Sequence, residues 1–359
     1  MFYLKEIKLN NFRCYSKYNE LFSPTINIIV GDNAVGKTSI IESVYALGVT
    51  KSHKATSDLE MIKHDTDFCF VKGLFFELEN NKKTEIVYSI TQQGKQIVKN
   101  EKKIKQISDY IGFFYTVMFC PEDVELIKGA PNNRRKFLDV NIGQVDREYL
   151  TSLIKYKKLL KQRNQLLKEI AENNKFDKQI LDILTSQLIK EAEKIISARK
   201  KFIIEINSSF NDCVMNISSE KEKVNIVYKS NCDVENLWKT FEEKEKLDLI
   251  TKTTNVGPHR DDFEIFFNDK NSGFASQGQQ KTFVLALKLA LVDIIKKKSN
   301  KIIIILDDVF GELDVQRQKK LIKLLEMDYQ IFITTTNIDH LDEEILNKSK
   351  IIRICKDGE

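Results

Sequence analysis

The sequence lacks the features that mark membrane-spanning and secreted proteins. No apolar run is long enough to cross a bilayer, and the densest stretch, residues 283–292, is interrupted by Lys288. The first residues carry neither a signal-peptide core nor a cleavage site. The six cysteines are scattered without a C-x-x-C pair, which is typical of reduced thiols and argues against disulfides or zinc. We therefore expect a cytoplasmic protein with no membrane partner.

Arginine is also scarce. Only 9 of the 57 basic residues are arginine, and the remainder are lysine. Four of the arginines, Arg13, Arg134, Arg135 and Arg260, fall in motif-like stretches. A planar guanidinium that binds two oxygens at once is something that lysine cannot replace. The net charge of +5 is small for 359 residues, so charge alone does not indicate a nucleic-acid-binding protein.

Proline and glycine are both absent from residues 146–210. Within this segment leucine or isoleucine recurs at intervals of seven, at positions 153, 160 and 167 and again at 181, 188 and 195. This spacing is typical of packed helices, and residues 172–175 interrupt it once. The segment therefore predicts two long antiparallel helices, a hairpin whose apolar stripe serves packing.

The chain does contain a complete phosphate-binding loop. Residues 31–38 match the pattern G-x-x-x-x-G-K-[ST] at every fixed position, between an apolar strand at 26–30 and a helix at 40–47. Two glycines let the backbone wrap closely around phosphate oxygens, and the helix adds the positive end of its dipole. We expect ATP to bind here, with Lys37 at the β- and γ-phosphates and the Thr38 hydroxyl on Mg²⁺. The predicted nucleotide-binding residues of this loop are Gly31, Asp32, Asn33, Ala34, Val35, Gly36, Lys37, Thr38 and Ser39.

A second acidic motif completes the predicted ATP site. Residues 302–306 are four isoleucines and a leucine, a run that predicts a strand in the middle of a parallel sheet, and Asp307 and Asp308 follow directly. A phosphate loop needs a carboxylate at the end of a neighbouring strand to hold Mg²⁺, and we assign that role to Asp307. Asp308 is the predicted general base that polarises the attacking water. Asp308 and Lys37 are the predicted catalytic residues.

The distance between the two motifs indicates the type of ATPase. Lys37 and Asp307 lie 270 residues apart and bracket the helical segment, whereas small GTPases and nucleotide kinases hold these parts much closer together. The gap favours a head of the ATP-binding-cassette type, in which a serine motif at a helix start completes the site of a second subunit. Ser276, Gly278 and Gln279 fit that motif. Taken alone, they also fit a simple helix N-cap.

The remaining patterns predict an α/β fold. Strands are expected at residues 2–9, 68–78, 85–91, 95–99, 223–229, 263–267, 329–333 and 350–355, with helices at 234–250 and 281–297 and a loop at 128–135. We predict a P-loop ABC-type ATPase head with a mixed sheet, built from both ends of the chain, and an inserted α-helical lobe. The expected boundaries are 1–125 and 253–359 for the head and 126–252 for the lobe.

Several stretches together resemble the RecF family of bacterial recombination mediators, over essentially the whole chain. They are residues 11–13 with the phosphate loop, residues 52–54, residues 257–262, residues 276–282 and residues 306–314. The most specific is the long stretch from Pro121 to Asp139, which is hard to find outside this family.

The resemblance implies a head like that of chromosome-maintenance (SMC) ATPases with a short helical lobe. It implies an ATP-dependent homodimer in which Ser276, Gly278 and Gln279 cap the partner's ATP, and Arg13 near the nucleotide. The dimer would clasp double-stranded or gapped DNA, and slow, DNA-dependent hydrolysis would release it. It further implies work with RecO and RecR in loading the RecA recombinase at single-strand gaps, in recombinational repair, replication and the response to DNA damage.

Some alternatives stay open. Gly311 stands where the family usually has Ser or Ala, and Lys281 where Arg is common. Transporter ATPases usually have Glu at the place of Asp308, and the shorter acid agrees with slow turnover. An ATPase subunit of a membrane transporter and a non-hydrolysing ATP-binding scaffold are the alternative functions.

The roles of two pairs of basic residues also stay open. Arg134 and Arg135 either bind DNA or a partner, or pair with Asp139 or Glu122. His259 and Arg260 are expected to pair with the neighbouring aspartates. The sequence shows no basic–aromatic pattern of the kind that binds single strands.

Overall fold

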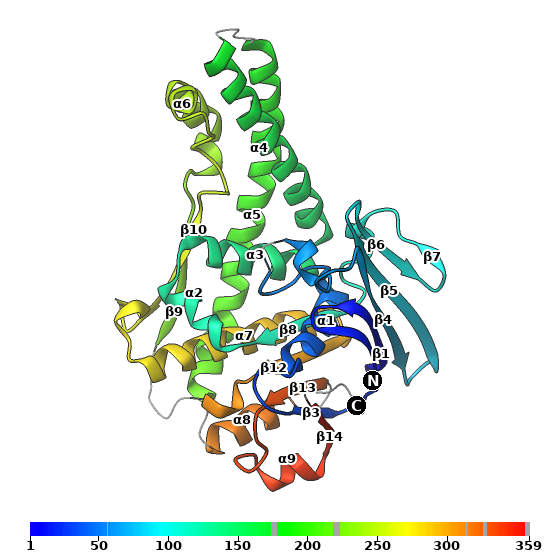
Figure 1. Cartoon of the computed structure of the whole chain (residues 1–359). Helices are drawn as coiled ribbons and strands as arrows, with labels where there is room; N and C mark the ends of the chain where they lie inside the picture. The colour runs from blue at the N-terminus through cyan, green and yellow to red at the C-terminus, as the bar shows by residue number, and fades with distance from the viewer. Residues whose placement is uncertain (56, 174–177, 218–222, 313–314, 326–328, 356–359) are drawn as a thin grey trace. The chain divides into compact units, whose positions relative to one another are not determined.

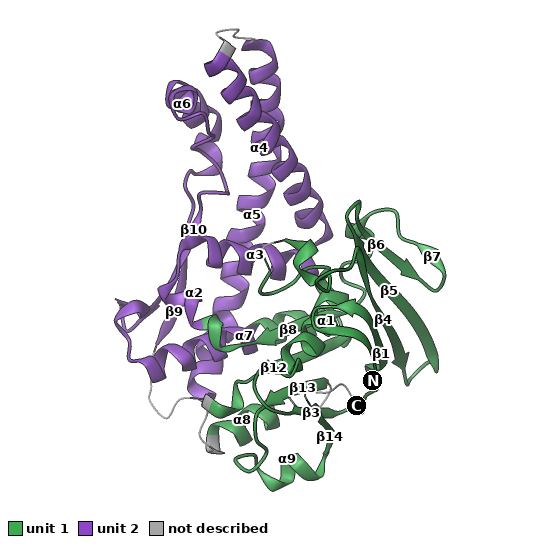
Figure 2. Ribbon diagram, in the orientation of Figure 1, with its two compact units in different colours: residues 1–123, 291–359 green, residues 124–290 purple. Residues whose placement is uncertain are grey.

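The computed structural model describes residues 1–55, 57–173, 178–217, 223–312, 315–325 and 329–355. The chain forms two compact units, residues 1–123 with 291–359 and residues 124–290 (Figure 2). The first unit combines both ends of the chain, and the second is inserted between them. The units divide at 123/124 and 290/291, whereas the predicted boundaries lie at 125/126 and 252/253. The later division differs because the strand Asp262–Phe267 pairs with the strand Val224–Lys229 of the inserted unit.

One sheet of the first unit is antiparallel. Its order is β2-β1-β4-β5-β6-β7, and its strands are β1 (Phe2–Phe12), β2 (Tyr15–Leu21), β4 (Phe68–Glu77), β5 (Lys82–Thr91), β6 (Gly94–Lys99) and β7 (Lys102–Lys103). Leu4, Ile7 and Leu9 of β1 are buried, while polar residues between them face outward. This alternation is what a sheet with one covered face requires.

The other sheet of the first unit is wholly parallel. Its order is β14-β3-β13-β12-β8, and its strands are β3 (Ile26–Val30), β8 (Tyr115–Phe119), β12 (Ile302–Asp307), β13 (Gln330–Thr335) and β14 (Ser349–Arg353). Every residue of β12 is buried, and the strand lies between β13 and β8. The predicted central position of this strand is confirmed, and β14 lies at the edge of the sheet.

Helix α1 (Lys37–Val49) contacts strands of both sheets, β8, β12 and β13 on one side and β1 and β4 on the other (Figure 1). A Cβ atom at Gly48 would lie 2.7 Å from the Thr116 side chain, so the helix and β8 approach closely. The layer of α1 between the sheets holds the phosphate loop at the carboxyl end of β3. Helices α8 (Val315–Leu325) and α9 (Glu343–Asn347) complete the described part of this unit, with 3₁₀ turns at Asp58–Met61, Ile107–Asp109, Pro121–Val124 and Phe310–Glu312.

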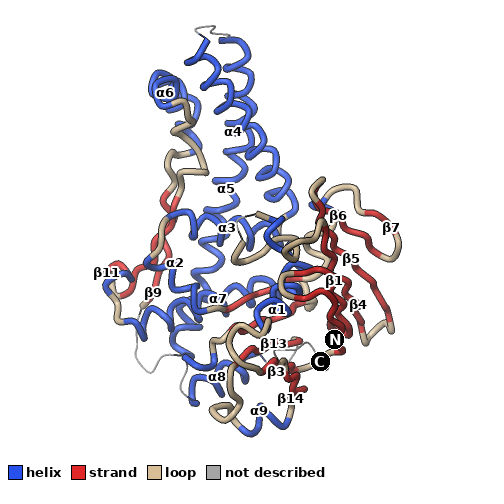
Figure 3. The backbone as a smooth tube through the Cα atoms, in the orientation of Figure 1, coloured by secondary structure: helices blue, strands red, loops and turns tan. Residues whose placement is uncertain are grey.

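The second unit is built on a helical hairpin. Helices α4 (Arg147–Asn173) and α5 (Lys178–Ile217) pack against each other (Figure 3). Leu167, Leu188 and Ile195 of the predicted stripe are completely buried, so the predicted hairpin is confirmed. Its second helix ends seven residues later than expected, at Ile217 rather than 210. Residues 174 and 175 of the predicted break lie outside the described residues.

The other elements of the second unit complete it, and the segment Leu237–Thr251 packs against the part of the hairpin that holds Arg163 and Thr185. These elements are α2 (Glu125–Lys128), α3 (Pro131–Val145), β9 (Val224–Lys229), α6 (Leu237–Thr251), β10 (Asp262–Phe267), β11 (Lys270–Asn271) and α7 (Gln277–Lys296), which runs past the division at 290/291, with 3₁₀ turns at Val234–Asn236 and Ser272–Phe274. The three strands form one antiparallel sheet, β11-β10-β9. Among the described residues, no helix is both long and apolar enough to cross a membrane.

Two predicted boundaries were wrong for local reasons. Residues 131–135, expected in a loop, form the first turn of α3, because Pro131 at the first helical position needs no N–H partner and has its φ already fixed. Helix α7 begins at Gln277, four residues earlier than predicted. Ser276 caps its first turn, since the Ser276 Oγ accepts from the Gln279 N–H and the Ser276 N–H donates to the Gln279 side chain.

Candidate nucleotide-binding site

The phosphate loop joins β3 to α1 with a backbone that only small residues can adopt. Gly36 has φ +107° and Ala34 has φ +66°, both in the left-handed region. A Cβ atom on Gly36 would lie 2.6 Å from the Tyr15 hydroxyl. That hydroxyl is buried and has no hydrogen-bond partner among the described residues, and burial raises its pKa above the usual value. Tyr15, which the sequence did not single out, thus backs the loop from β2.

Lys37 holds the loop in its folded path. Its Nζ donates to the carbonyls of Gly31 (2.8 Å) and Asp32 (2.9 Å), and the side chain is buried. Helix α1 has no side-chain N-cap, so its first backbone N–H groups are available to an anion at its positive end. The predicted loop residues therefore lie together, arranged as a cradle for phosphate oxygens.

The two halves of the predicted metal site meet in the first unit. The Thr38 hydroxyl lies 3.5 Å from Asp307 Oδ1, and the Thr334 hydroxyl donates to the same oxygen at 2.8 Å. The Thr334 Oγ1 also accepts from the Asp308 N–H at 3.0 Å. Thr334 is a positioning residue that sequence reasoning missed, although a strand ending in three threonines was a usable signal.

The donors around Asp307 fit a divalent cation. The Lys54 ammonium lies 3.7 Å from Asp307 Oδ2 and 3.3 Å from Glu122 Oε1, so a positive charge already lies beside these oxygens. Burial raises the pKa of Asp307, and Asp308 and Glu122 add to the rise against the opposing Thr334 and Lys54. Carboxylate and hydroxyl oxygens are the ligands that Mg²⁺ prefers. The residues present therefore fit a Mg²⁺-bound nucleotide.

Two of the motif stretches, residues 11–13 and 52–54, meet behind the loop at Glu42 of α1. Arg13 binds the buried Glu42 of α1 through Nε (2.7 Å) and Nη2 (2.6 Å). Glu42 also accepts from the Ser52 hydroxyl, which in turn accepts from the Lys54 N–H at 3.0 Å. Arg13, predicted near the nucleotide, is thus held on Glu42, and the chain of contacts fixes where Lys54 enters the site. Glu42 was not predicted.

Replacing Gly36 by alanine is expected to destabilise the loop and abolish nucleotide binding. The new Cβ would collide with Tyr15 at a φ that alanine rarely adopts, at a cost of about 1–3 kcal/mol. Thermal unfolding and nucleotide titration by calorimetry measure the two effects. Gly311→Ala is the matched control, because among the described residues, apart from its chain neighbours, no atom lies within 4 Å of a Cβ built there. Equal behaviour of the two variants would contradict this account of Gly36.

The predicted signature residues lie at the start of α7, in the second unit. Ser276, Gln277 and Gly278 are exposed. The loop before them is fixed by the buried Gln280, whose side-chain amide donates to the carbonyls of Ser272, Gly273 and Ala275 at 3.4, 3.2 and 2.9 Å. Apart from its chain neighbours and the backbone of its own helix, no described atom lies within 4 Å of a Cβ built on Gly278. The described fold thus gives no internal reason for a glycine there. Leu313 and Asp314 of the last motif lie outside the described residues.

The arginine pair of α3 binds within the second unit, but not to the partners expected. Arg134 binds Asp262 through two bonds of 2.6 and 2.9 Å, and Arg135 donates to the Asp261 carbonyl at 2.9 Å. Asp139 and Glu122, the alternative to DNA or a partner subunit, are not the residues that these arginines bind, because β10 brings residues 261 and 262 beside α3. This leaves the guanidinium of Arg134 half of a structural ion pair.

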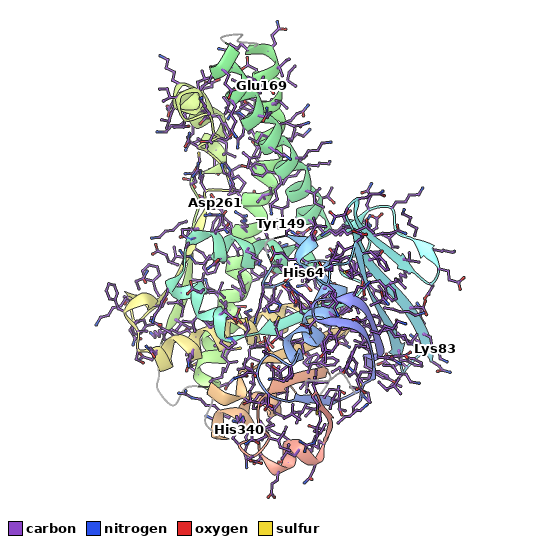
Figure 4. The ribbon with its side chains drawn as sticks, viewed as in Figure 1. His64, Lys83, Tyr149, Glu169, Asp261 and His340 are labelled. Carbon is purple, nitrogen blue, oxygen red and sulfur yellow. The ribbon has the colours of Figure 1, made fainter. Side chains whose placement is uncertain are left out.

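Asp139 and Asp261 instead share Arg199 of α5, at 2.7 and 3.3 Å. Figure 4 labels Asp261 and Tyr149, whose hydroxyl donates to Asp139 and accepts from Arg199. Because Asp261 is completely buried, this network ties β10 to the hairpin. The expected pairing of His259 and Arg260 with the neighbouring aspartates was wrong, because both side chains bond the Thr254 carbonyl instead.

His259 makes the second unit sensitive to acid. It bonds the Tyr156 hydroxyl at 2.6 Å and the Thr254 carbonyl at 2.9 Å, and burial lowers its pKa to about 4. In the unfolded chain this imidazole binds a proton below about pH 6.5, whereas in the folded chain it does so only below about pH 4. Stability should fall by up to about 3 kcal/mol across that window. Urea unfolding at pH 7 and 4.5 should show a smaller fall for His259→Gln; an unchanged fall would contradict this.

Comparison with known proteins agrees with this geometry. The family model described as RecF/RecN/SMC N terminal domain matches residues 3–357. The DNA replication and repair proteins RecF of Bacillus thuringiensis (strain Al Hakam) and Bacillus cereus (strain B4264) are each 38% identical to the chain over 364 residues, which cover 98% of this chain and 96% of theirs.

Solved structures give the same result. A structure of the recombination mediator protein RecF-ATP in the RecFOR pathway has a TM-score of 0.88 and 34% identity, covering 95% of this chain and 94% of that chain. An Smc head bound to the C-winged helix domain of ScpA has a TM-score of 0.56 at 16% identity, covering 99% and 96%, and supports the fold alone. The predicted resemblance and the predicted SMC-like ATPase head are confirmed. The chain therefore belongs to the RecF family of DNA replication and repair proteins.

Proposed function

We propose that this protein is an ATP-dependent DNA-binding protein of recombinational repair. Mg-ATP bound at the phosphate loop joins two copies, the dimer holds DNA at single-strand gaps, and weak DNA-dependent hydrolysis releases it. RecO and RecR are the proposed protein partners, because a solved relative acts in the RecFOR pathway. A transporter subunit is not supported, since relatives over nearly the full length are DNA replication and repair proteins.

One observation carries the nucleotide part of this proposal. Thr38 and Asp307 are far apart in sequence, yet their oxygens lie 3.5 Å apart. Thr38 and Asp307 would hold Mg²⁺, and the ion would supply charge neutralisation for the phosphates. Lys37 would exchange the carbonyls of Gly31 and Asp32 for phosphate oxygens. Arg13 is proposed to act through Glu42 and Ser52, as a positioning residue.

Asp308 is the proposed general base. Its backbone is held in the left-handed region, with φ +52°, by the Thr334 hydroxyl on its N–H. Aspartate is among the few residues that adopt this conformation readily, so the backbone and the Thr334 contact together position the carboxylate. The carboxylate of Asp308 would orient a water toward the γ-phosphate, and it would accept a proton from that water.

The second copy is proposed to act through the exposed start of α7. The Ser276 hydroxyl oxygen accepts from Gln279 at 3.3 Å, which leaves its proton for a phosphate oxygen of the partner. Gly278 has open space around it, so a requirement for glycine would come from outside the chain. Phe274, two residues earlier, is 86% exposed. These features support a contact with another copy.

Mixing two inactive variants tests the composite site. Lys37→Met removes the phosphate contact, and Ser276→Arg blocks the signature, so each variant alone should hydrolyse ATP at background rate. A mixed dimer contains one site built from the intact loop of the Ser276→Arg copy and the intact Ser276 of the other. We expect mixing to restore up to about half of the wild-type rate per mixed dimer.

The mixing experiment has two controls, in which each single variant is mixed with a double variant. Either variant mixed with a Lys37→Met, Ser276→Arg double variant should regain no hydrolysis. The mixture with Lys37→Met contains no intact loop, and the mixture with Ser276→Arg contains no intact Ser276. A failure of the two single variants to complement, with wild type active, would contradict action of Ser276 on the partner. A wild-type chain that dimerises without hydrolysis would favour the scaffold alternative.

A further inference from the structure

Lysines from distant parts of the first unit gather at one end of its antiparallel sheet. They are Lys5 of β1, Lys82 and Lys83 of β5, Lys99 of β6 and Lys301 before β12, and we call them the lysine cluster. Figure 4 labels Lys83 at this end of the sheet. The sequence could not show the cluster, because its members come from four separate segments.

On the outer face, two members of the cluster lie over one aromatic ring. The Nζ atoms of Lys5 and Lys83 lie 4.7 and 5.3 Å from the centre of the Phe76 ring. The Tyr3 ring lies 5.8 Å from the same ring. Strand register places Phe76 opposite both Tyr3 and Lys83, so this arrangement follows from the pairing of the three strands.

At the same end of the sheet, Lys99 and Lys301 lie over the Phe113 ring, with their Nζ atoms 4.0 and 5.7 Å from its centre. Glu77 binds Lys301 at 2.7 Å. Partial burial lowers the pKa of Lys99, and the like charges of Lys82 and Lys301 lower it further against Glu77. Part of the lowering thus comes from neighbouring positive charges that outweigh the one nearby carboxylate, Glu77.

Several other lysines of this sheet do have a carboxylate partner. On the same sheet Lys8, Lys72 and Lys95 bind carboxylates at 3.0, 2.7 and 2.8 Å. Among the described residues, no carboxylate lies within ion-pair distance of Lys5, Lys82, Lys83 or Lys99. The lysine cluster thus places several unneutralised charges at one end of the sheet, beside Phe76 on its outer face and Phe113 on its covered face.

We propose that the lysine cluster is a DNA-binding surface that grips the phosphate backbone. The inference rests on the proposed function, to which it adds a contact surface on the head away from the phosphate loop. Lysine ammonium groups bind phosphates as point charges, and releasing counterions makes such binding salt-dependent. Phe76 and Phe113 are partly exposed beside these cations, and contact of their exposed parts with sugars or unpaired bases would favour DNA over an acidic protein segment.

The test compares two matched double variants of the full-length protein. Lys83→Gln with Lys99→Gln removes one cation from each ring. Lys320→Gln with Lys323→Gln removes two exposed cations from α8 of the same unit. Fluorescence anisotropy with a labelled duplex, and separately with a single strand of equal length, measures affinity with a non-hydrolysed ATP analogue and Mg²⁺ present. Sedimentation in the same buffer without DNA measures dimerisation.

We expect the cluster variant to bind DNA about tenfold more weakly, with the slope of log affinity against log salt reduced by about 2. The α8 variant should stay within about threefold of wild type. A larger loss on the single strand than on the duplex assigns the rings to unpaired bases, and equal losses assign the site to phosphates alone.

Equal DNA affinity of both variants and wild type overturns the inference while the proposed function stands. Competition by poly-glutamate as strong as by DNA of equal charge also overturns it, in favour of an acidic protein partner. Wild-type protein that neither dimerises with ATP nor binds DNA contradicts the proposed function itself.

Discussion

Asp308→Asn is expected to lower ATP hydrolysis by roughly 10²–10⁴-fold, the usual contribution of a general base. The substitution keeps size and shape, and asparagine tolerates the left-handed backbone that Asp308 adopts at φ +52°. The bond from its N–H to Thr334 uses the backbone and is retained. The negative charge is lost, and with it the ability to take a proton. ATP binding and ATP-dependent dimerisation should therefore persist, and the dimer should remain on DNA longer.

Single-turnover hydrolysis of Mg-ATP, with and without duplex DNA, measures the effect directly. Asp339→Asn is a suitable control, because it removes another exposed carboxylate just after β13. Hydrolysis by Asp308→Asn within threefold of both wild type and the control would exclude Asp308 as the base. It would leave the nucleotide-binding role of the loop untouched.

Asp307→Asn is expected to impair function while leaving the fold as stable as before. The carboxylate is buried, and burial raises its pKa. A carboxyl whose folded pKa is raised destabilises the folded state at every pH where it is ionised, and the cost disappears on protonation as pH falls. Asparagine removes that cost and can still accept from Thr334. The free energy of unfolding at pH 7 should therefore be unchanged or higher by about 1 kcal/mol.

The functional loss from Asp307→Asn should be large. Even outer-shell partners of a metal contribute 10–100-fold to its affinity, so loss of a charged ligand should weaken Mg-ATP binding by at least about 100-fold. Urea unfolding in EDTA measures the stability, and calorimetric titration with Mg-ATP measures the affinity. A variant destabilised by more than about 2 kcal/mol without ligand would contradict the expected stability. A variant with normal Mg-ATP affinity would contradict the role of Asp307 as a metal ligand.

Local patterns in the sequence carried much of this structure. The phosphate loop and the isoleucine strand each depend on residues that are neighbours in the chain, so their geometry follows from spacing. The hairpin was predictable because a seven-residue apolar repeat without proline or glycine leaves few alternatives to packed helices. The first residues of α3 and α7 were less predictable. They depend on Pro131 and on the Ser276 cap, whose effect the local sequence pattern did not show.

Side-chain partners were not predictable, because they depend on which strands become neighbours. Arg134 binds Asp262 and Arg199 binds Asp261 only because β10 lies beside α3 and α5. Thr334 reaches Asp307 only because β13 is adjacent to β12 in a parallel register. The lysine cluster likewise requires the order of the antiparallel sheet. In each case the residue was visible in the sequence, but its partner was not.

Sedimentation velocity of the full-length protein tests the central claim most directly. The experiment compares wild type, Lys37→Met and Ser276→Arg, each without nucleotide, with Mg-ATP, and with Mg-ATP and a gapped duplex. The account predicts that wild type is a monomer without nucleotide, dimerises with Mg-ATP, and carries the DNA as a dimer, while both variants stay monomeric. Wild type that binds ATP yet stays monomeric, with or without DNA, would contradict an ATP-joined pair of copies as the DNA-binding form.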